Sequence, residues 1–150
     1  MPGTYAENTT VPVTRSRDEI ERILMRFGAT SFGYAYSQSV VTIGFEVKNV
    51  RVKMMMELPP MPPDRDFRGR KRSETTVQAE WEKACRQRWR TLANGVKAKL
   101  AMIDDGISTV EKEFFADIVT NNGETLWDRR HEITKIYIPL AQVAITEGGG

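Results

Sequence analysis

The side chains best suited to chemistry in this chain are its cations, because it holds one histidine and one cysteine. A zinc site needs several His or Cys ligands, and Ser–His–Asp or Cys–His catalysis would depend on the lone imidazole of His131. His131 fits an exposed helix surface, and Cys85 fits a buried apolar position. Acidic residues between 104 and 117 are explained by helix caps and a solvated face. We therefore expect no enzyme activity, catalytic residue, metal or cofactor.

Positive charge is concentrated in the middle of the chain, although the formal net charge is only +2. Residues 65–103 contain eleven Lys/Arg and four Asp/Glu, whereas residues 104–150 contain four Lys/Arg and nine Asp/Glu. This asymmetry indicates a polyanionic partner, self-association through complementary faces, or two solvated surfaces.

One helical stripe and one loop of the basic region could contact phosphates. Lys83, Arg86, Arg90 and Lys97 follow one another at intervals of 3, 4 and 7 residues, which places them on one helix face. Only Glu80 and Glu82 oppose the cations of this helix, and a solvated face usually mixes both signs. A solvated face and a surface for an acidic protein remain as alternatives. The nucleic-acid-binding candidates are Arg70, Lys71, Arg72, Lys83, Arg86, Arg90, Lys97, Lys99, Tyr34 and Tyr36.

The two tyrosines among these candidates have two interpretations. Tyr34 and Tyr36 alternate with small residues along a predicted strand, together with Phe32. Aromatic rings on a sheet can stack with bases. Aromatic residues that alternate along a strand are more often part of the core.

Hydrophobic periodicity predicts the N-terminal elements that would position these side chains. A capping box of Ser16 and Glu19 begins a helix over 17–27, which Gly28 ends. Three alternating segments follow, and the intervals between them are too short for parallel crossovers. The pattern therefore predicts a three-stranded antiparallel meander over 32–36, 41–47 and 50–58.

Prolines at 59, 60, 62 and 63 end the sheet. A capping box of Thr75 and Gln78 begins a long amphipathic helix over 76–103. Its apolar seam, the natural cover for the sheet, is Trp81, Cys85, Trp89, Leu92, Val96, Leu100 and Ile103. Two short helices are expected after it, one over 109–119 with a Ser108–Glu111 capping box. The other begins near Thr125 and Asp128 and includes Ile136 and Tyr137.

The predicted fold class is therefore α+β: a helix, a three-stranded antiparallel meander, a long amphipathic helix packed on the sheet, and two short C-terminal helices. We expect a flexible arm at 1–14, a single domain at 15–140 with a mobile basic loop at 59–74, and a disordered tail at 141–150. No apolar run approaches the ~18 residues of a membrane span, so no membrane contact is expected.

Two resemblances add to this interpretation. The string from Trp89 to Phe114, with Ser16–Gly28, Ile43-Gly44-Phe45 and Leu58-Pro59 in the same order, resembles a family of small proteins encoded in tailed phages and prophages. That resemblance covers roughly residues 11–140 and implies a location in the host bacterial cytoplasm. The β-β-β-α order with a basic final helix is similar in topology to the core of single-strand annealing proteins of the Rad52 and phage recombinase type.

These observations predict a phage-type accessory protein that binds nucleic acid, preferably single-stranded DNA, for annealing in recombination or replication. A homo-oligomer is expected because a three-stranded sheet has two edges that need partners. The alternative is a non-enzymatic phage protein that inhibits a host defence enzyme or sequesters a signalling molecule. A pocket in place of a basic stripe would favour that alternative.

Overall fold

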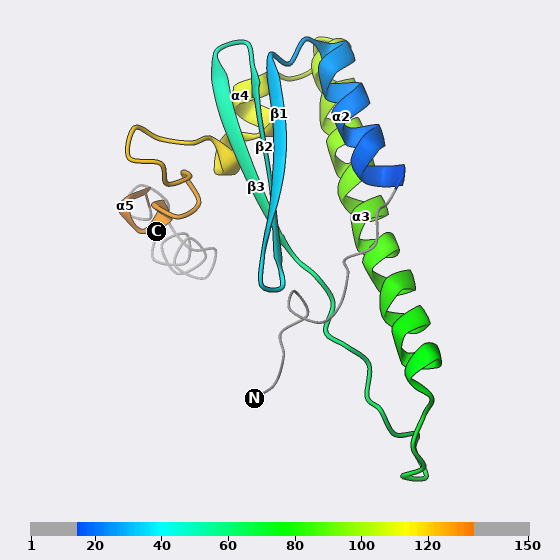
Figure 1. Cartoon of the computed structure of the whole chain (residues 1–150). Helices are drawn as coiled ribbons and strands as arrows, with labels where there is room; N and C mark the ends of the chain where they lie inside the picture. The colour runs from blue at the N-terminus through cyan, green and yellow to red at the C-terminus, as the bar shows by residue number, and fades with distance from the viewer. Residues whose placement is uncertain (1–14, 134–150) are drawn as a thin grey trace, which may run out of the picture.

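The computed structural model describes residues 15–133, and its elements follow the predicted order (Figure 1). The elements are helix α2 (Arg15–Phe27), strands β1 (Ser31–Ser37), β2 (Val40–Val47) and β3 (Val50–Glu57), helix α3 (Glu74–Asp104), helix α4 (Val110–Glu113), 3-10 helix η1 (Phe115–Asp117) and helix α5 (Arg130–Ile133). The α+β class and the antiparallel sheet are confirmed. The expected N-terminal arm and C-terminal tail lie outside the described residues.

The three strands form an antiparallel meander in the order β1-β2-β3. Two-residue turns join them, because Ser37 pairs with Val40 and Val47 pairs with Val50. In the second turn, Lys48 and Asn49 have φ of 48° and 65°, the left-handed values that a type I′ hairpin turn requires. Such a turn matches the twist of the flanking strands and fixes their register.

The core lies between one face of the sheet and the two long helices. On β2, every second residue from Val41 to Val47 is buried, and Ile20 and Leu24 of α2 are buried against the same core. The predicted seam of α3 is confirmed at Trp81, Cys85, Trp89, Val96 and Leu100, whereas Leu92 and Ile103 are partly buried. Figure 1 shows α2 and α3 on the same side of the sheet.

The start of α3 differs from the predicted capping box. Ser73 caps this helix, accepting a hydrogen bond from the Thr76 amide at 3.1 Å, and the helix begins two residues before the predicted position. Ser73 also donates through its hydroxyl to Thr76 Oγ1 at 2.7 Å. Thr75, the predicted cap, lies inside the helix.

The other two predicted capping boxes are also wrong. Ser16 lies inside α2 and is buried. Thr109 caps α4 by accepting a hydrogen bond from the Lys112 amide at 3.2 Å, while Ser108 donates to the Glu113 carboxylate at 2.6 Å. Several neighbouring hydroxyls can serve as a cap, so the sequence alone places the helix start only to within one or two residues.

The predicted 109–119 helix is interrupted because residues in it pack against the core and pair with β3. Phe114 is fully buried, and its ring meets that of Phe45 edge to face with centroids 5.3 Å apart. Ile118 then pairs with Val52, and the Val119 amide donates to the Arg51 carbonyl at 2.8 Å. The outer edge of β3 is therefore partly paired. Among residues 15–133, the β1 edge has no partner strand, as expected, and the β3 edge is covered in part.

The predicted pairing of Thr125 with Asp128 is present. The Thr125 amide donates to the Asp128 carboxylate at 3.0 Å, and the Asp128 amide donates to Thr125 Oγ1 at 3.1 Å. A helical turn, α5, begins shortly after, at Arg130. The part of this helix predicted around Ile136 and Tyr137 lies outside the described residues.

The first turns of α3 extend beyond the sheet, and residues 58–73 run beside them (Figure 1). The Trp81 indole N–H donates to the buried Pro59 carbonyl at 2.8 Å, and Arg88 donates to the Glu57 carbonyl at 2.8 Å. Arg72, nearer the far end, forms an ion pair with Glu80. From here on, the arm means residues 58–80, not the N-terminal segment 1–14. The tip loop is residues 64–72, at the far end of this arm.

Candidate nucleic-acid interface

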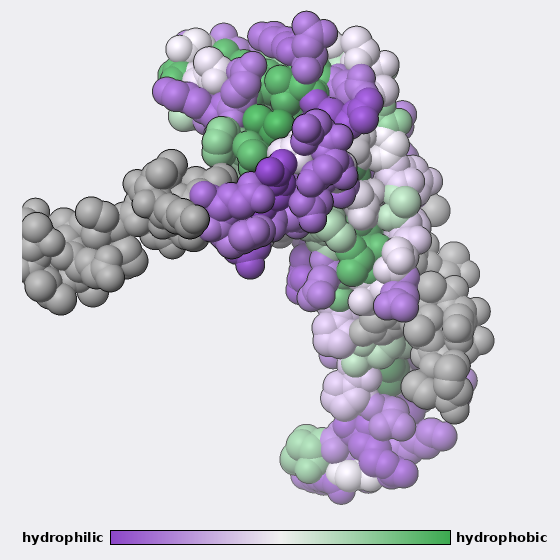
Figure 2. All heavy atoms as spheres, turned by 90° about the vertical axis from the view of Figure 1, so that its left-hand side faces the viewer, coloured by the Kyte–Doolittle hydropathy of each residue, from purple (hydrophilic) through white to green (hydrophobic). Residues whose placement is uncertain are grey.

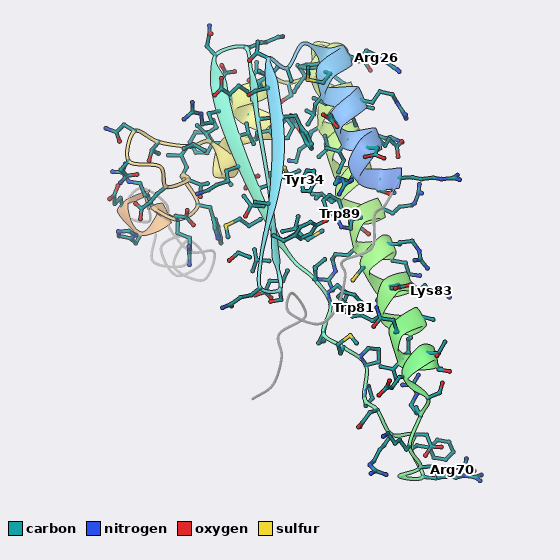
Figure 3. The ribbon with its side chains drawn as sticks, viewed as in Figure 1. Arg26, Tyr34, Arg70, Trp81, Lys83 and Trp89 are labelled. Carbon is teal, nitrogen blue, oxygen red and sulfur yellow. The ribbon has the colours of Figure 1, made fainter. Side chains whose placement is uncertain are left out.

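Three of the predicted cations lie together on the outer face of α3. Lys83, Arg86 and Arg90 are exposed, and they lie outside the face of the helix that buries Trp81 and Trp89. Figure 3 shows Lys83 pointing away from the sheet, with the two tryptophans on the side of α3 that faces it. The structure therefore supports the predicted stripe over these three positions.

These three cations border an open groove between α3 and the start of α2. The groove has a volume of about 640 Å³. Its lining residues are Arg15, Ser16, Lys83, Arg86, Gln87, Arg90 and Thr91. The side chains that line it carry only positive charge or none, and its hydroxyl and amide groups can donate hydrogen bonds to phosphate oxygens.

No ion pair within the described chain neutralises the four cations that line this groove. Within residues 15–133, no carboxylate lies within 4.0 Å of the charged nitrogens of Arg15, Lys83, Arg86 or Arg90. The pKa of the Glu19 carboxyl nearby is lowered, chiefly by a hydrogen bond from Lys97 and further by the charges of Arg90 and Arg22. A polyanion would meet a positive field here.

Lys97, the fourth cation of the predicted stripe, and Lys99, predicted as a further contact, are both bonded to neighbouring elements. Lys97 forms an ion pair with Glu19 of α2. Lys99 donates to the Glu113 carbonyl at 2.6 Å, and its ammonium lies 5.6 Å from the centre of the Phe114 ring. Both ammonium groups are thus partly satisfied within the fold, although Lys97 remains exposed.

The predicted cations of the tip loop are placed at the far end of the arm. Arg70 donates to Asp66 at 3.0 Å, and Arg72 pairs with Glu80, so both charges are partly compensated. Lys71 is exposed, and no carboxylate of the described chain pairs with it. In Figure 3, Arg26, Lys83 and Arg70 follow one another down the outer side of the molecule. The tip loop and the stripe therefore lie along the same side.

The two candidate tyrosines lie on the sheet face that meets the helices. Tyr34 pairs with Ile43, and Tyr36 pairs with Val41, so their side chains share the face of these core residues. Tyr36 is partly buried, and burial raises the pKa of its hydroxyl. Tyr34 is 45% exposed, with the Arg17 guanidinium 4.2 Å from its ring centre. This placement favours the core interpretation for Tyr36 and covers one side of Tyr34.

Sequence reasoning missed the contribution of α2 to this face. Arg15, Arg22 and Arg26 are exposed on α2, and Arg15 lines the groove beside Arg86 and Arg90. The intervals of 7 and 4 residues between them are a stripe pattern like that of α3. This spacing could have predicted a basic face on α2. We missed it because the positive and negative residues of the N-terminal third are equal in number.

Three further features of residues 15–133 concern metal ligands, the histidine and membrane-spanning helices. No three His, Cys, Asp or Glu side chains in residues 15–133 are grouped as metal ligands would be. His131 is exposed, with its Nε2 4.0 Å from the Glu132 carboxylate. No helix in this part of the chain is both long and apolar enough to cross a lipid bilayer.

Cys85 should be unreactive in the folded protein. Its side chain is fully buried, and burial raises the pKa of the thiol to about 11. At pH 7, on the order of one thiol in ten thousand would be ionised, and the thiolate is the reactive form. We expect a thiol reagent to label Cys85 slowly in buffer and completely in denaturant. Rapid labelling of the folded protein would contradict the buried position.

No protein-family model matches the chain, and no curated protein and no solved structure matches it either.

Proposed function

We propose that this protein is a non-enzymatic nucleic-acid-binding protein that holds the phosphate backbone along the outer face of α2 and α3. The observation that carries the proposal is the open groove in which Arg15, Lys83, Arg86 and Arg90 gather, none of them in an ion pair with a carboxylate of the described residues. Cations that protrude from rigid helices on one side of a fold are suited to a regularly spaced polyanion.

The interaction would derive its strength from release of the counterions that surround a nucleic acid. Each phosphate that a Lys or Arg neutralises releases condensed cations, so the affinity falls as salt rises. With four groove cations engaged, the slope of log K against log salt would be about −3 for a single strand. Contacts from Arg22, Arg26 or Lys71 would steepen it.

A salt-titrated binding assay tests the proposal. The full chain is titrated with fluorescent single-stranded DNA, duplex DNA and RNA of equal length, each at several salt concentrations. We expect binding that weakens by about fiftyfold between 50 and 200 mM salt, the factor that a slope of about −3 gives for a fourfold rise in salt. Absence of binding at low salt, or an affinity that salt does not change, would contradict the proposal.

The same groove supports a second candidate function, sequestration of a small anionic nucleotide. Its volume of about 640 Å³ lies within the range of small-ligand pockets, ~300–1,000 Å³. A sequestering protein would bind a mononucleotide or dinucleotide as tightly as it binds a long strand. A nucleic-acid-binding protein would gain affinity with strand length, so a length series from two to twenty nucleotides separates the two functions.

A further inference from the structure

Phe67 is the most exposed large apolar side chain of the described residues. It is 92% exposed and lies in the tip loop, at the end of the arm. Figure 2 shows the projecting end as mainly hydrophilic, interrupted by a small hydrophobic area. A single exposed apolar residue is common on protein surfaces. Phe67 differs from such residues because hydrogen bonds fix the loop that carries it.

The backbone around Phe67 is held in one conformation by a network centred on Asp66. One carboxylate oxygen of Asp66 accepts hydrogen bonds from the amides of Arg68 and Arg70, both at 2.9 Å. These backbone hydrogen bonds, that from Arg70 foremost, lower the pKa of Asp66. The Asp66 amide donates to the Arg70 carbonyl, and Gly69, at a φ of 80°, donates to the Asp66 carbonyl. The loop therefore presents its aromatic ring on a preorganised turn.

The base of the loop is fastened as well. Arg65 and Lys71 form an antiparallel bridge, and Arg65 Nη1 donates to the Gly69 carbonyl at 2.9 Å. The Arg72 amide donates to the Asp64 carbonyl at 2.7 Å. Where the loop leads into α3, Arg72 forms an ion pair with Glu80 of that helix, so the loop is joined to a rigid helix. Ordering the loop on binding would therefore cost little conformational entropy.

Cations surround the ring on this turn. The Arg68 guanidinium lies 5.3 Å from the centre of the Phe67 ring, and Lys71 is exposed nearby on the same loop. An aromatic ring among cations matches a nucleic-acid strand, in which bases and phosphates alternate at short intervals. A lipid bilayer would be better matched by several apolar side chains, and the tip loop contains only Phe67.

We propose that Phe67 stacks on unpaired bases and makes the arm select single-stranded over duplex nucleic acid. This inference rests on the proposed function and names its substrate class. In a duplex each base is already stacked on its neighbours, and inserting a side chain requires unstacking. In a single strand the base faces are accessible, so Phe67 can stack on them without that cost. Arg68 and Lys71 would meet the flanking phosphates.

Two oligomers of equal length and charge test the inference: oligothymidylate and its abasic counterpart. The full-length chain and its Phe67→Ala variant are each titrated with both. We expect the substitution to weaken binding of oligothymidylate by about tenfold, the effect of losing one stacked base. Binding of the abasic oligomer and the salt dependence should stay unchanged. Phe67→Trp should restore the affinity, because a larger ring stacks as well.

A matched control is Phe115→Ala, which removes an aromatic ring that is 54% exposed on η1. This variant should bind both oligomers as the unchanged chain does. Equal affinity of Phe67→Ala and the unchanged chain for oligothymidylate would overturn the stacking inference and leave the proposed function intact. If Phe67→Ala lost affinity for anionic phospholipid vesicles and kept its affinity for oligothymidylate, the stacking inference would be overturned in favour of a membrane contact. Failure of the unchanged chain to bind either oligomer would overturn both proposals.

Discussion

Replacing Lys83, Arg86 and Arg90 together by Glu is expected to abolish binding of single-stranded DNA without unfolding the domain. All three side chains are exposed, and within the described chain none has a carboxylate partner that the change would leave unpaired. The substitution turns an attractive groove into a repulsive one. The affinity at low salt should fall by more than a hundredfold, and any residual binding should have a salt slope smaller by about 2.

The measurement is a salt-titrated binding curve together with a thermal unfolding curve. A control with the same change in net charge is Lys48→Glu, Lys112→Glu and Arg130→Glu, at exposed positions on the hairpin, α4 and α5. We expect the control to reduce affinity much less, since it affects only the long-range field. Equal losses in the two triple variants would show that net charge, and not the groove, governs binding.

Lys97 illustrates why the stripe could be predicted only in part. Helical spacing places Lys97 near the face of Arg90, and this much follows from the sequence. Its partner Glu19 belongs to α2, more than seventy residues earlier in the chain. Spacing along one helix determines which side chains share a face, whereas the packing of two helices determines which of them are neutralised.

The seam of α3 could be predicted because a repeated interval of three or four residues is determined by helix geometry alone. The C-terminal helices were less predictable for a physical reason. Val110, Phe114 and Ile118 have helical spacing, yet Ile118 pairs with Val52 of β3. An unpaired strand edge competes with the helix for the same backbone groups. Only the folded sheet shows that this edge is available.

In the tip loop, the sequence predicted less ordered structure than the fold contains. Its prolines and cations, with almost nothing apolar, led us to expect a loop without fixed structure. The structure places Asp66 where its side chain can accept two backbone amides, and Gly69 supplies the positive φ of 80° that the turn needs. An Asp followed three residues later by Gly is a recognisable turn signal. We did not predict this turn because the many Arg and Lys residues around it indicated a mobile loop.

The largest effects on stability are expected at the two tryptophans of the α3 seam. Trp81 and Trp89 are both fully buried, and changing either to Ala should lower the free energy of unfolding by about 3–5 kcal/mol. Such losses are a large fraction of a domain's stability, which is about 5–15 kcal/mol. Urea unfolding followed by circular dichroism measures them. A loss below about 1 kcal/mol would contradict a role in the core.

Changing each tryptophan to Phe separates the packing of the ring from its hydrogen bond. The Trp81 indole donates to the buried Pro59 carbonyl at 2.8 Å, whereas no group of the described chain accepts a hydrogen bond from the Trp89 indole. Both substitutions remove similar volume, but only Trp81→Phe leaves a buried carbonyl unsatisfied, at a cost of about 1–3 kcal/mol. Trp81→Phe should therefore be the more destabilising of the two by about that amount.

The same comparison tests how the arm is attached to α3. Pro59 lies where the chain leaves the sheet, and its hydrogen bond from Trp81 joins the returning segment to the helix. In Trp81→Phe, limited proteolysis between residues 60 and 72 should become faster, because local opening exposes the backbone. Trp89→Phe should leave that rate unchanged. If both variants were equally stable and cleaved equally fast, the hydrogen bond would not hold the arm.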